Sequence, residues 1–223
     1  MRNKEDLKTF VEIVMWQIKG MKGYFFIPLY ILYVIQPVYI FLVLWVGYGF
    51  KEMYIYDEIT SAVMGLYPPL SLWWTLWVLK KYLEDDEREL YYVDRKTKWM
   101  EVFTYYFLYT VASALILLIY SIWIGMGQSV YLLLCTAAMG FFYHAFAYWF
   151  AYLTKSASIV LIPLLIYTFW VMSPYQYQTS QIRYTRLFYD GIFKGILWSF
   201  AFFLLGVIFI KMGKWENRKY NTY

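Results

Sequence analysis

Most of the side chains that could do chemistry stand in one stretch, residues 80–101, where 13 of 22 are charged. Six of them are basic and seven are acidic. A loop whose charges only orient a membrane protein explains the basic residues, but acidic residues contribute little to orientation. Mixed charge of this density also suits the docking of a protein partner. Charge alone leaves both interpretations open, and the acidic residues favour docking.

The rest of the chain offers few groups for chemistry. Of the Asp, Glu, Lys, Arg and His residues, its long apolar stretches contain only two, His144 and Lys194. Ion-coupled transport needs charged residues within such stretches, and catalysis or metal binding needs several groups together. His144 has no acidic neighbour, so we expect it to be hydrogen-bonded within a helix bundle, and an intramembrane enzyme centred on it is the less favoured alternative. The sequence also lacks a GxxxxGK[ST] phosphate-binding loop. We therefore expect no catalytic site, no metal site and no cofactor in this chain.

The apolar stretches predict an all-α membrane protein. The sequence is 62% hydrophobic and 16% charged, whereas soluble domains have about 25% charged residues. A helix needs roughly 20 apolar residues to cross a bilayer core, and backbone groups in lipid have to be satisfied within the helix. The stretch 102–153 is long enough for two helices and divides at the glycines of 125–128. Six spans are therefore expected, at about 24–50, 59–79, 102–124, 129–153, 156–173 and 191–210.

Prolines predict irregular helices in three of these spans. They stand at positions 28 and 37 in the first span, 68 and 69 in the second, and 163 in the fifth. A proline lacks the backbone N–H and clashes with the preceding turn, so we expect a kink or a break at each.

Lysine and arginine predict the orientation, because they mark the cytoplasmic side of a membrane protein. The N-terminal segment, residues 80–101, the connection at Lys155 and the C-terminal tail together hold 16 of the 20, and the other side holds four. Both termini and residues 80–101 are therefore expected in the cytoplasm, with an outer loop at 174–190. This topology explains the net charge of +5, so nucleic acid is not an expected partner.

Residues 1–23 predict a separate N-terminal helix. Six apolar residues recur there at helical spacing, with charged residues on the other side. This pattern is typical of an amphipathic helix along the membrane surface, although it also fits an extension of the first span. Gly20 and Gly23 offer a bend, which favours the separate helix. The apolar face comprises Leu7, Phe10, Val11, Val14, Ile18 and Met21.

Together these features resemble one family, the membrane subunits of ABC-2 type ABC transporters. Its members have six spans, an amphipathic N-terminal connecting helix and a coupling helix between spans two and three. Here residues 4–22 match the connecting helix, and LEDDERELYYVDRKTKWMEVF lies between spans two and three. The family's short inner connection between spans four and five corresponds to TKSAS. Its longer outer connection between spans five and six corresponds to PYQYQTSQIRYTRLFYD. The likeness extends along the whole chain in architecture and charge layout, but the Gly-Thr and Pro that many members carry in the coupling loop are missing.

The resemblance implies a permease subunit of an ATP-driven exporter in the plasma membrane, without an ATPase site of its own. A partner ATPase subunit would supply ATP and Mg²⁺ and dock on residues 80–101. A second copy or a sister permease would complete the unit within membrane lipid, and spans two and five would line the substrate path. The docking residues would be Glu84, Asp85, Glu87, Arg88, Glu89, Tyr91 and Tyr92. The path residues would be Tyr67, Trp74, Thr75, Tyr167, Thr168 and Trp170.

An aromatic, uncharged path favours a hydrophobic or amphipathic substrate. Peptide export, including resistance to antimicrobial peptides, is the first hypothesis. The 26 tyrosines of the chain could supply adaptable hydroxyl contacts to such a cargo, or they could be compositional bias without bearing on it. The alternative of a different class is a membrane scaffold or immunity-type protein, which would dock a partner without transporting anything.

Overall fold

The structure is a computed structural model and describes residues 2–48, 52–84, 98–163, 166 and 192–220. Regular structure in these ranges is helical throughout. Five helical runs of the described part are long and apolar enough to cross a membrane, which indicates a membrane protein. The long helices are α1 (Arg2–Met21), α4 (Glu52–Leu83), α6 (Lys98–Ile124), α7 (Met126–Thr154) and α11 (Ile192–Tyr220).

Between α1 and α4 the helix changes type several times. Pro28 and Pro37 each stand in the first turn of an α-helical piece that follows directly on another helical piece. The π turn that separates the two pieces is a common site of helix irregularity. The predicted interruptions of the first span therefore take the form of changes in helix type. In order, the pieces are η1 (Lys22–Phe26, 3₁₀), α2 (Ile27–Tyr30), η2 (Ile31–Ile35, π), α3 (Gln36–Val43) and η3 (Leu44–Tyr48, π).

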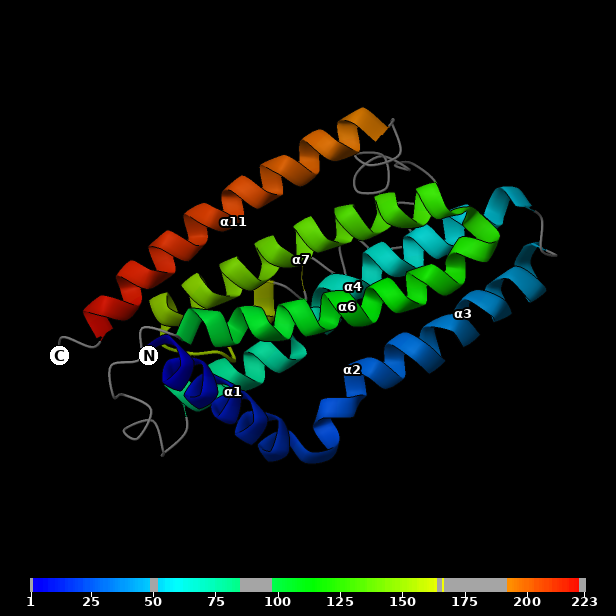
Figure 1. Cartoon of the computed structure of the whole chain (residues 1–223). Helices are drawn as coiled ribbons and strands as arrows, with labels where there is room; N and C mark the ends of the chain where they lie inside the picture. Colours follow the sequence, from blue (N-terminus) through cyan, green and yellow to red (C-terminus); the bar gives the residue numbers. More distant parts are fainter. Residues whose placement is uncertain (1, 49–51, 85–97, 164–165, 167–191, 221–223) are drawn as a thin grey trace.

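Helix α1 lies at an angle to the first span, and the chain bends sharply between α1 and α2 (Figure 1). The residue with left-handed backbone at this bend is Lys22, with φ of 49°, rather than either of the neighbouring glycines. Val14 and Met21 are buried against the bundle, and Phe10 and Ile18 pack on the same core. Most of the described part of the predicted apolar face therefore packs on other helices of the chain, whereas Val11 is half exposed.

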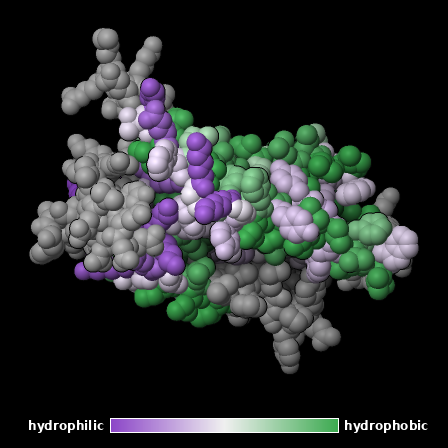
Figure 2. Space-filling view, turned by 90° about the horizontal axis from the view of Figure 1, so that it is seen from below, coloured by the Kyte–Doolittle hydropathy of each residue, from purple (hydrophilic) through white to green (hydrophobic). Residues whose placement is uncertain are grey.

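The bundle has two distinct ends. Both termini, the end of α4 at Leu83 and the start of α6 lie at one end, which we call the charged end (Figure 1). Figure 2 shows that hydrophilic side chains gather toward this end, while most of the remaining visible surface is apolar. The turn at Gly125, between α6 and α7, lies at the opposite end; its φ of 85° suits a residue without a Cβ.

The described helices extend beyond the apolar limits that predicted them. Helix α4 runs to Leu83, so Lys80–Leu83 are helical and not part of a loop; α6 begins at Lys98, so Lys98–Glu101 are helical as well. A helix satisfies its own backbone and can continue into a polar environment, which hydropathy does not reveal. Helix α4 also runs through Pro68 and Pro69 as one element, so the second span is not broken there.

Half of the fifth predicted span, 156–173, and all of the predicted outer loop 174–190 fall outside the described residues. A turn follows α7, and a helical turn begins at Leu161. Helices α7 and α11 are parallel, since Tyr131 lies against Gly195 near one end and Tyr148 lies against Gly213 near the other. The chain that leaves α7 at the charged end therefore has to return to the opposite end before α11 begins.

Glycines allow α11 to approach α7 closely. A Cβ on Gly206 would lie 2.6 Å from the Phe141 ring, and one on Gly213 would lie 2.5 Å from the Tyr148 ring. Aromatic side chains fill the rest of this interface, with Phe141 stacked on Phe203 at a centroid distance of 4.9 Å. Small residues that admit large neighbours are a usual solution for helix packing in membranes.

Candidate functional site

Four polar side chains form a buried network at the charged end, which we call the polar junction: Gln17, Tyr82, Glu101 and Tyr105. The Gln17 amide Nε2 donates to Tyr82 Oη at 2.9 Å and to Glu101 Oε2 at 2.7 Å. The Tyr82 hydroxyl also donates to Glu101 Oε2. Tyr105 donates to Gln17 Oε1 at 2.9 Å. Both amide hydrogens and the amide oxygen of Gln17 are therefore used.

The polar junction joins three helices that are far apart in the sequence. Gln17 comes from α1, Tyr82 from the last turn of α4, and Glu101 from the first turns of α6. All four side chains are at most 5% exposed, and Glu101 is fully buried. A buried group that loses its partner costs about 1–3 kcal/mol, and more when it is charged, so the network favours one arrangement of these helix ends.

A second set of polar contacts holds the end of α4 just beyond Leu83. Glu84 Oε1 accepts hydrogen bonds from the Ser156 hydroxyl and, at 3.0 Å, from the Ser158 backbone N–H. Glu84 Oε2 accepts from the Ser158 hydroxyl at 2.8 Å. Burial of the Glu84 carboxyl opposes its ionisation, but these hydrogen bonds outweigh that effect and hold its pKa below the ordinary value. The serines belong to TKSAS, the short connection after α7, so this connection is attached to the end of α4.

Glu84 is the one predicted docking residue that the structure describes, and its carboxyl is engaged by the chain's own serines. The other six lie outside the described residues: Asp85, Glu87, Arg88, Glu89, Tyr91 and Tyr92. What the structure does describe is the attachment of the segment that carries them. Glu84, at the start of that segment, is hydrogen-bonded to the connection after α7. Glu101, which follows the segment, takes part in the polar junction.

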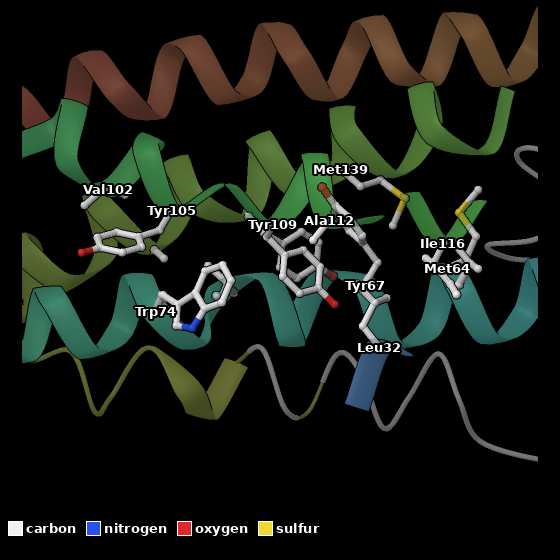
Figure 3. Close-up of a cluster of buried hydrophobic side chains, with 14 of the residues drawn as sticks. Leu32, Met64, Tyr67, Trp74, Val102, Tyr105, Tyr109, Ala112, Ile116 and Met139 are labelled. Atoms are coloured by element: carbon white, nitrogen blue, oxygen red, sulfur yellow. The ribbon is translucent and has the colours of Figure 1, made fainter. Parts of the chain in front are cut away.

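The described residues of the predicted path lie inside the bundle (Figure 3). Tyr67, Trp74 and Thr75 are each no more than 2% exposed. The Tyr67 hydroxyl and Thr110 Oγ1 of α6 are 2.8 Å apart, and Trp74 Nε1 donates to the Phe25 carbonyl at 2.9 Å. Their polar atoms therefore serve contacts within the chain. Tyr167, Thr168 and Trp170 lie outside the described residues.

A small pocket borders Tyr67 between the first three spans. Its volume of about 10 Å³ is the room that one water molecule needs. Buried Gln36 and Ser113 are among its lining residues, but the surface that faces the pocket is apolar. Space of this size cannot hold a peptide or a lipid. A substrate path would have to lie at another surface or open in another conformation.

His144 is fully buried and hydrogen-bonded, in agreement with the favoured interpretation of the sequence. Its Nδ1 lies 2.7 Å from the Gly140 carbonyl, and its Nε2 lies 3.0 Å from the Ser71 carbonyl of α4. A neutral imidazole carries one N–H and can donate to one of these carbonyls at a time. The ring therefore links α7 to α4. No group of three or more potential metal ligands occurs in the described part of the chain.

Sequence reasoning did not find the polar junction. Gln17 stands among the apolar residues of α1, and Tyr82 is one of many tyrosines. Glu101 was counted with the charged stretch, although its side chain is buried. One signal was available in the sequence, because Gln17 occupies the same helical face as Val14 and Met21, where a polar residue needs a buried partner.

Comparisons of the chain with protein-family models, characterised proteins and solved structures give no match. The function has to be argued from the residues themselves.

Proposed function

We propose that this chain is the membrane-spanning subunit of an ATP-driven exporter of the ABC-2 type. In this proposal the segment 80–101 faces the cytoplasm and docks on a separate ATPase subunit, which binds ATP and Mg²⁺. A second permease copy or a sister subunit completes the transporter in the plasma membrane. The proposed cargo is hydrophobic or amphipathic, and a peptide is the first candidate.

The observation that carries the proposal is the attachment of the charged segment at both of its ends. At one end Glu84 accepts three hydrogen bonds from the connection after α7. At the other end Glu101 is buried against Gln17 of α1 and Tyr82 of α4. A force applied to the segment would therefore reach α1, α4, α6 and α7 together. A loop that served only to orient the protein would need no such attachment.

The course of the described helices supports the fifth span of the proposal, and with it a total of six. Helix α7 ends at the charged end and the parallel α11 begins at the opposite end. A helix covers about 1.5 Å per residue, so roughly 20 residues are enough for the return across a bilayer core. The 37 residues from 155 to 191 provide that length and include the apolar stretch 156–173.

A membrane scaffold or immunity-type protein is the second candidate, and the packing of Tyr67 and Trp74 favours it. Both side chains are buried against other helices of the same chain, and the pocket beside Tyr67 has room for about one water molecule. In a scaffold, the charged segment would still dock a partner, but no substrate path would be needed.

Gentle solubilisation from the native membrane, followed by mass spectrometry of stoichiometric partners, separates the two candidates. The transporter proposal predicts a soluble subunit with a phosphate-binding loop, and a second six-span chain if the permease is heteromeric. Recovery with a partner that has no nucleotide site would favour the scaffold. Recovery of the chain alone, under conditions that preserve known membrane complexes, would contradict docking in both forms.

A further inference from the structure

Four lysines belong to the two chain segments that meet where Gly20, near the end of α1, lies beside Lys81, near the end of α4. We call them the basic cluster: Lys19, Lys22, Lys80 and Lys81. A Cβ on Gly20 would lie only 3.3 Å from Lys81 Nζ and 3.2 Å from the Trp77 ring. The Lys81 ammonium therefore rests beside the α1 backbone, between the attachment points of Lys19 and Lys22. Lys80 is the exposed neighbour of Lys81 on α4.

The position of the Lys81 ammonium is fixed by packing. The Lys81 ammonium sits over the Trp77 ring, 4.2 Å from its centroid, which holds the charge by a cation–π contact. Lys22 adopts a left-handed backbone, with φ of 49°, at the bend between α1 and the first span. A β-carbon makes that conformation unfavourable, so the bend costs free energy with lysine in this place.

Exposed aromatic side chains near the cluster indicate its depth in a bilayer. Trp16 is 78% exposed and Tyr24 is 63% exposed, and in the sequence they flank Lys19 and Lys22. Exposed tryptophan and tyrosine beside an apolar span are typical of the headgroup region of a membrane. The four ammonium groups would lie at the depth of the lipid phosphates.

The cluster also has unbalanced charge within the described part of the chain. No salt bridge in that part involves the four lysines, whereas Lys8, nearer the start of α1, pairs with Glu12. Grouped lysines near a membrane surface attract anionic headgroups by about 1 kcal/mol each. We propose that the basic cluster binds the headgroup of an anionic phospholipid, which would fix α1 against the bilayer. This inference does not depend on the transporter proposal.

The test is a lipid titration of the full-length protein in detergent, followed by native mass spectrometry. The probes are phosphatidylglycerol, phosphatidylcholine and inorganic phosphate. The test variant carries Lys→Gln at all four cluster positions. A matched variant carries Lys8→Gln, Lys155→Gln, Lys211→Gln and Lys214→Gln, which removes the same charge without touching the cluster.

We expect phosphatidylglycerol to bind the unaltered protein at least tenfold more tightly than phosphatidylcholine. The cluster variant should lose at least tenfold in affinity for phosphatidylglycerol, and the matched variant should change less than twofold. An equal loss in both variants would overturn the proposal, since the attraction would then be diffuse. No loss in either would overturn it as well, because the lysines would then take no part in lipid binding. Displacement of the lipid by equimolar inorganic phosphate would show that a free anion, and not a lipid, is the ligand.

Two single variants keep the test decisive if the fourfold variant does not fold. Lys22→Gln and Lys80→Gln change exposed side chains, and each should weaken phosphatidylglycerol binding about fivefold, the equivalent of about 1 kcal/mol. The corresponding Lys→Arg changes keep the charge and should bind as the unaltered protein does. Unchanged binding in both glutamine variants would contradict the proposal.

Discussion

The polar junction and the interface between α7 and α11 hold helices together in opposite ways. The junction uses directional hydrogen bonds between Gln17, Tyr82, Glu101 and Tyr105, which come from three helices. The α7–α11 interface uses shape, with glycines that admit aromatic rings. Close packing resists change along the whole length of the interface, whereas the network depends on a few directional contacts that a shift of one helix end would break. The hydrogen-bonded region is the one beside the charged segment, where a partner would act.

The largest loss of stability is expected at the α7–α11 interface, where close packing holds the helices together. In Gly213→Leu the new Cβ would lie 2.5 Å from the Tyr148 ring and 3.1 Å from the Trp149 backbone, so the helices have to separate. Overpacking of this kind costs about 3 kcal/mol. Unfolding in detergent, followed by near-UV circular dichroism, should show that loss. Gly127→Leu is the control, because a Cβ there meets nothing within 4 Å. Equal stability of the two variants would mean that α11 does not pack on α7 as described.

A smaller effect is expected from breaking the polar junction. Gln17→Leu keeps the size of the side chain but leaves Tyr82, Glu101 and Tyr105 each without one hydrogen bond. The expected loss is about 2 kcal/mol in the free energy of unfolding, measured in the same way. Met15→Leu, on the exposed side of α1, should change it by less than about 0.5 kcal/mol. A Gln17→Leu protein as stable as the unaltered one would contradict the network.

The junction should also behave as one unit. Glu101→Gln in the Gln17→Leu protein should cost less than Glu101→Gln in the unaltered protein, because the Gln17 contact to Glu101 is already lost. A coupling of about 1 kcal/mol is expected for residues in one network. The same change at Glu12, which is exposed on α1, should show no coupling to Gln17. Additive costs at Gln17 and Glu101 would show that the two side chains act independently.

The smallest effect is the contribution of Glu84 to the pH dependence of stability. The folded-state pKa of this carboxyl lies below its usual value near 4.5, so its contribution is present above about pH 4.5 and is lost as the pH falls through the lower, folded-state pKa. Because the carboxyl is partly exposed, the contribution is about 0.5 kcal/mol. The unaltered protein should therefore lose more stability than Glu84→Gln between pH 6 and pH 3, in thermal unfolding. Identical slopes for the two proteins would remove the Glu84 contacts from the account.

The helical, membrane-spanning character was predictable because apolar length and the lack of charge determine it directly. Helix ends were less predictable, since α4 and α6 continue through Lys81 and Lys98 into the charged stretch. The bend was expected at glycines but has its left-handed residue at Lys22, where tertiary contacts outweigh the local preference. The attachment of Glu84 to Ser156 and Ser158 joins residues more than 70 positions apart, and no local pattern reveals such a pairing.

The predicted site was only partly accessible to the same reasoning. Charge density drew attention to residues 80–101, but it could not distinguish a solvated acid from the buried Glu101. Aromatic residues of the second span suggested a path, whereas Trp74 and Tyr67 pack against Phe25 and Tyr109 inside the chain. A side chain's neighbours depend on how the helices cross, and that arrangement is not written in the composition of one span.

In the proposed transporter, the charged segment receives work from an ATPase and passes it to the helices through the polar junction. ATP hydrolysis by the co-purified assembly tests it most directly, with Glu87→Lys/Glu89→Lys and Gln17→Leu compared to the unaltered chain. We predict that the charge reversal removes the ATPase from the assembly, while Gln17→Leu keeps it bound but lowers its stimulated hydrolysis. Full stimulated hydrolysis in both variants, or an assembly without any ATPase, would contradict the claim.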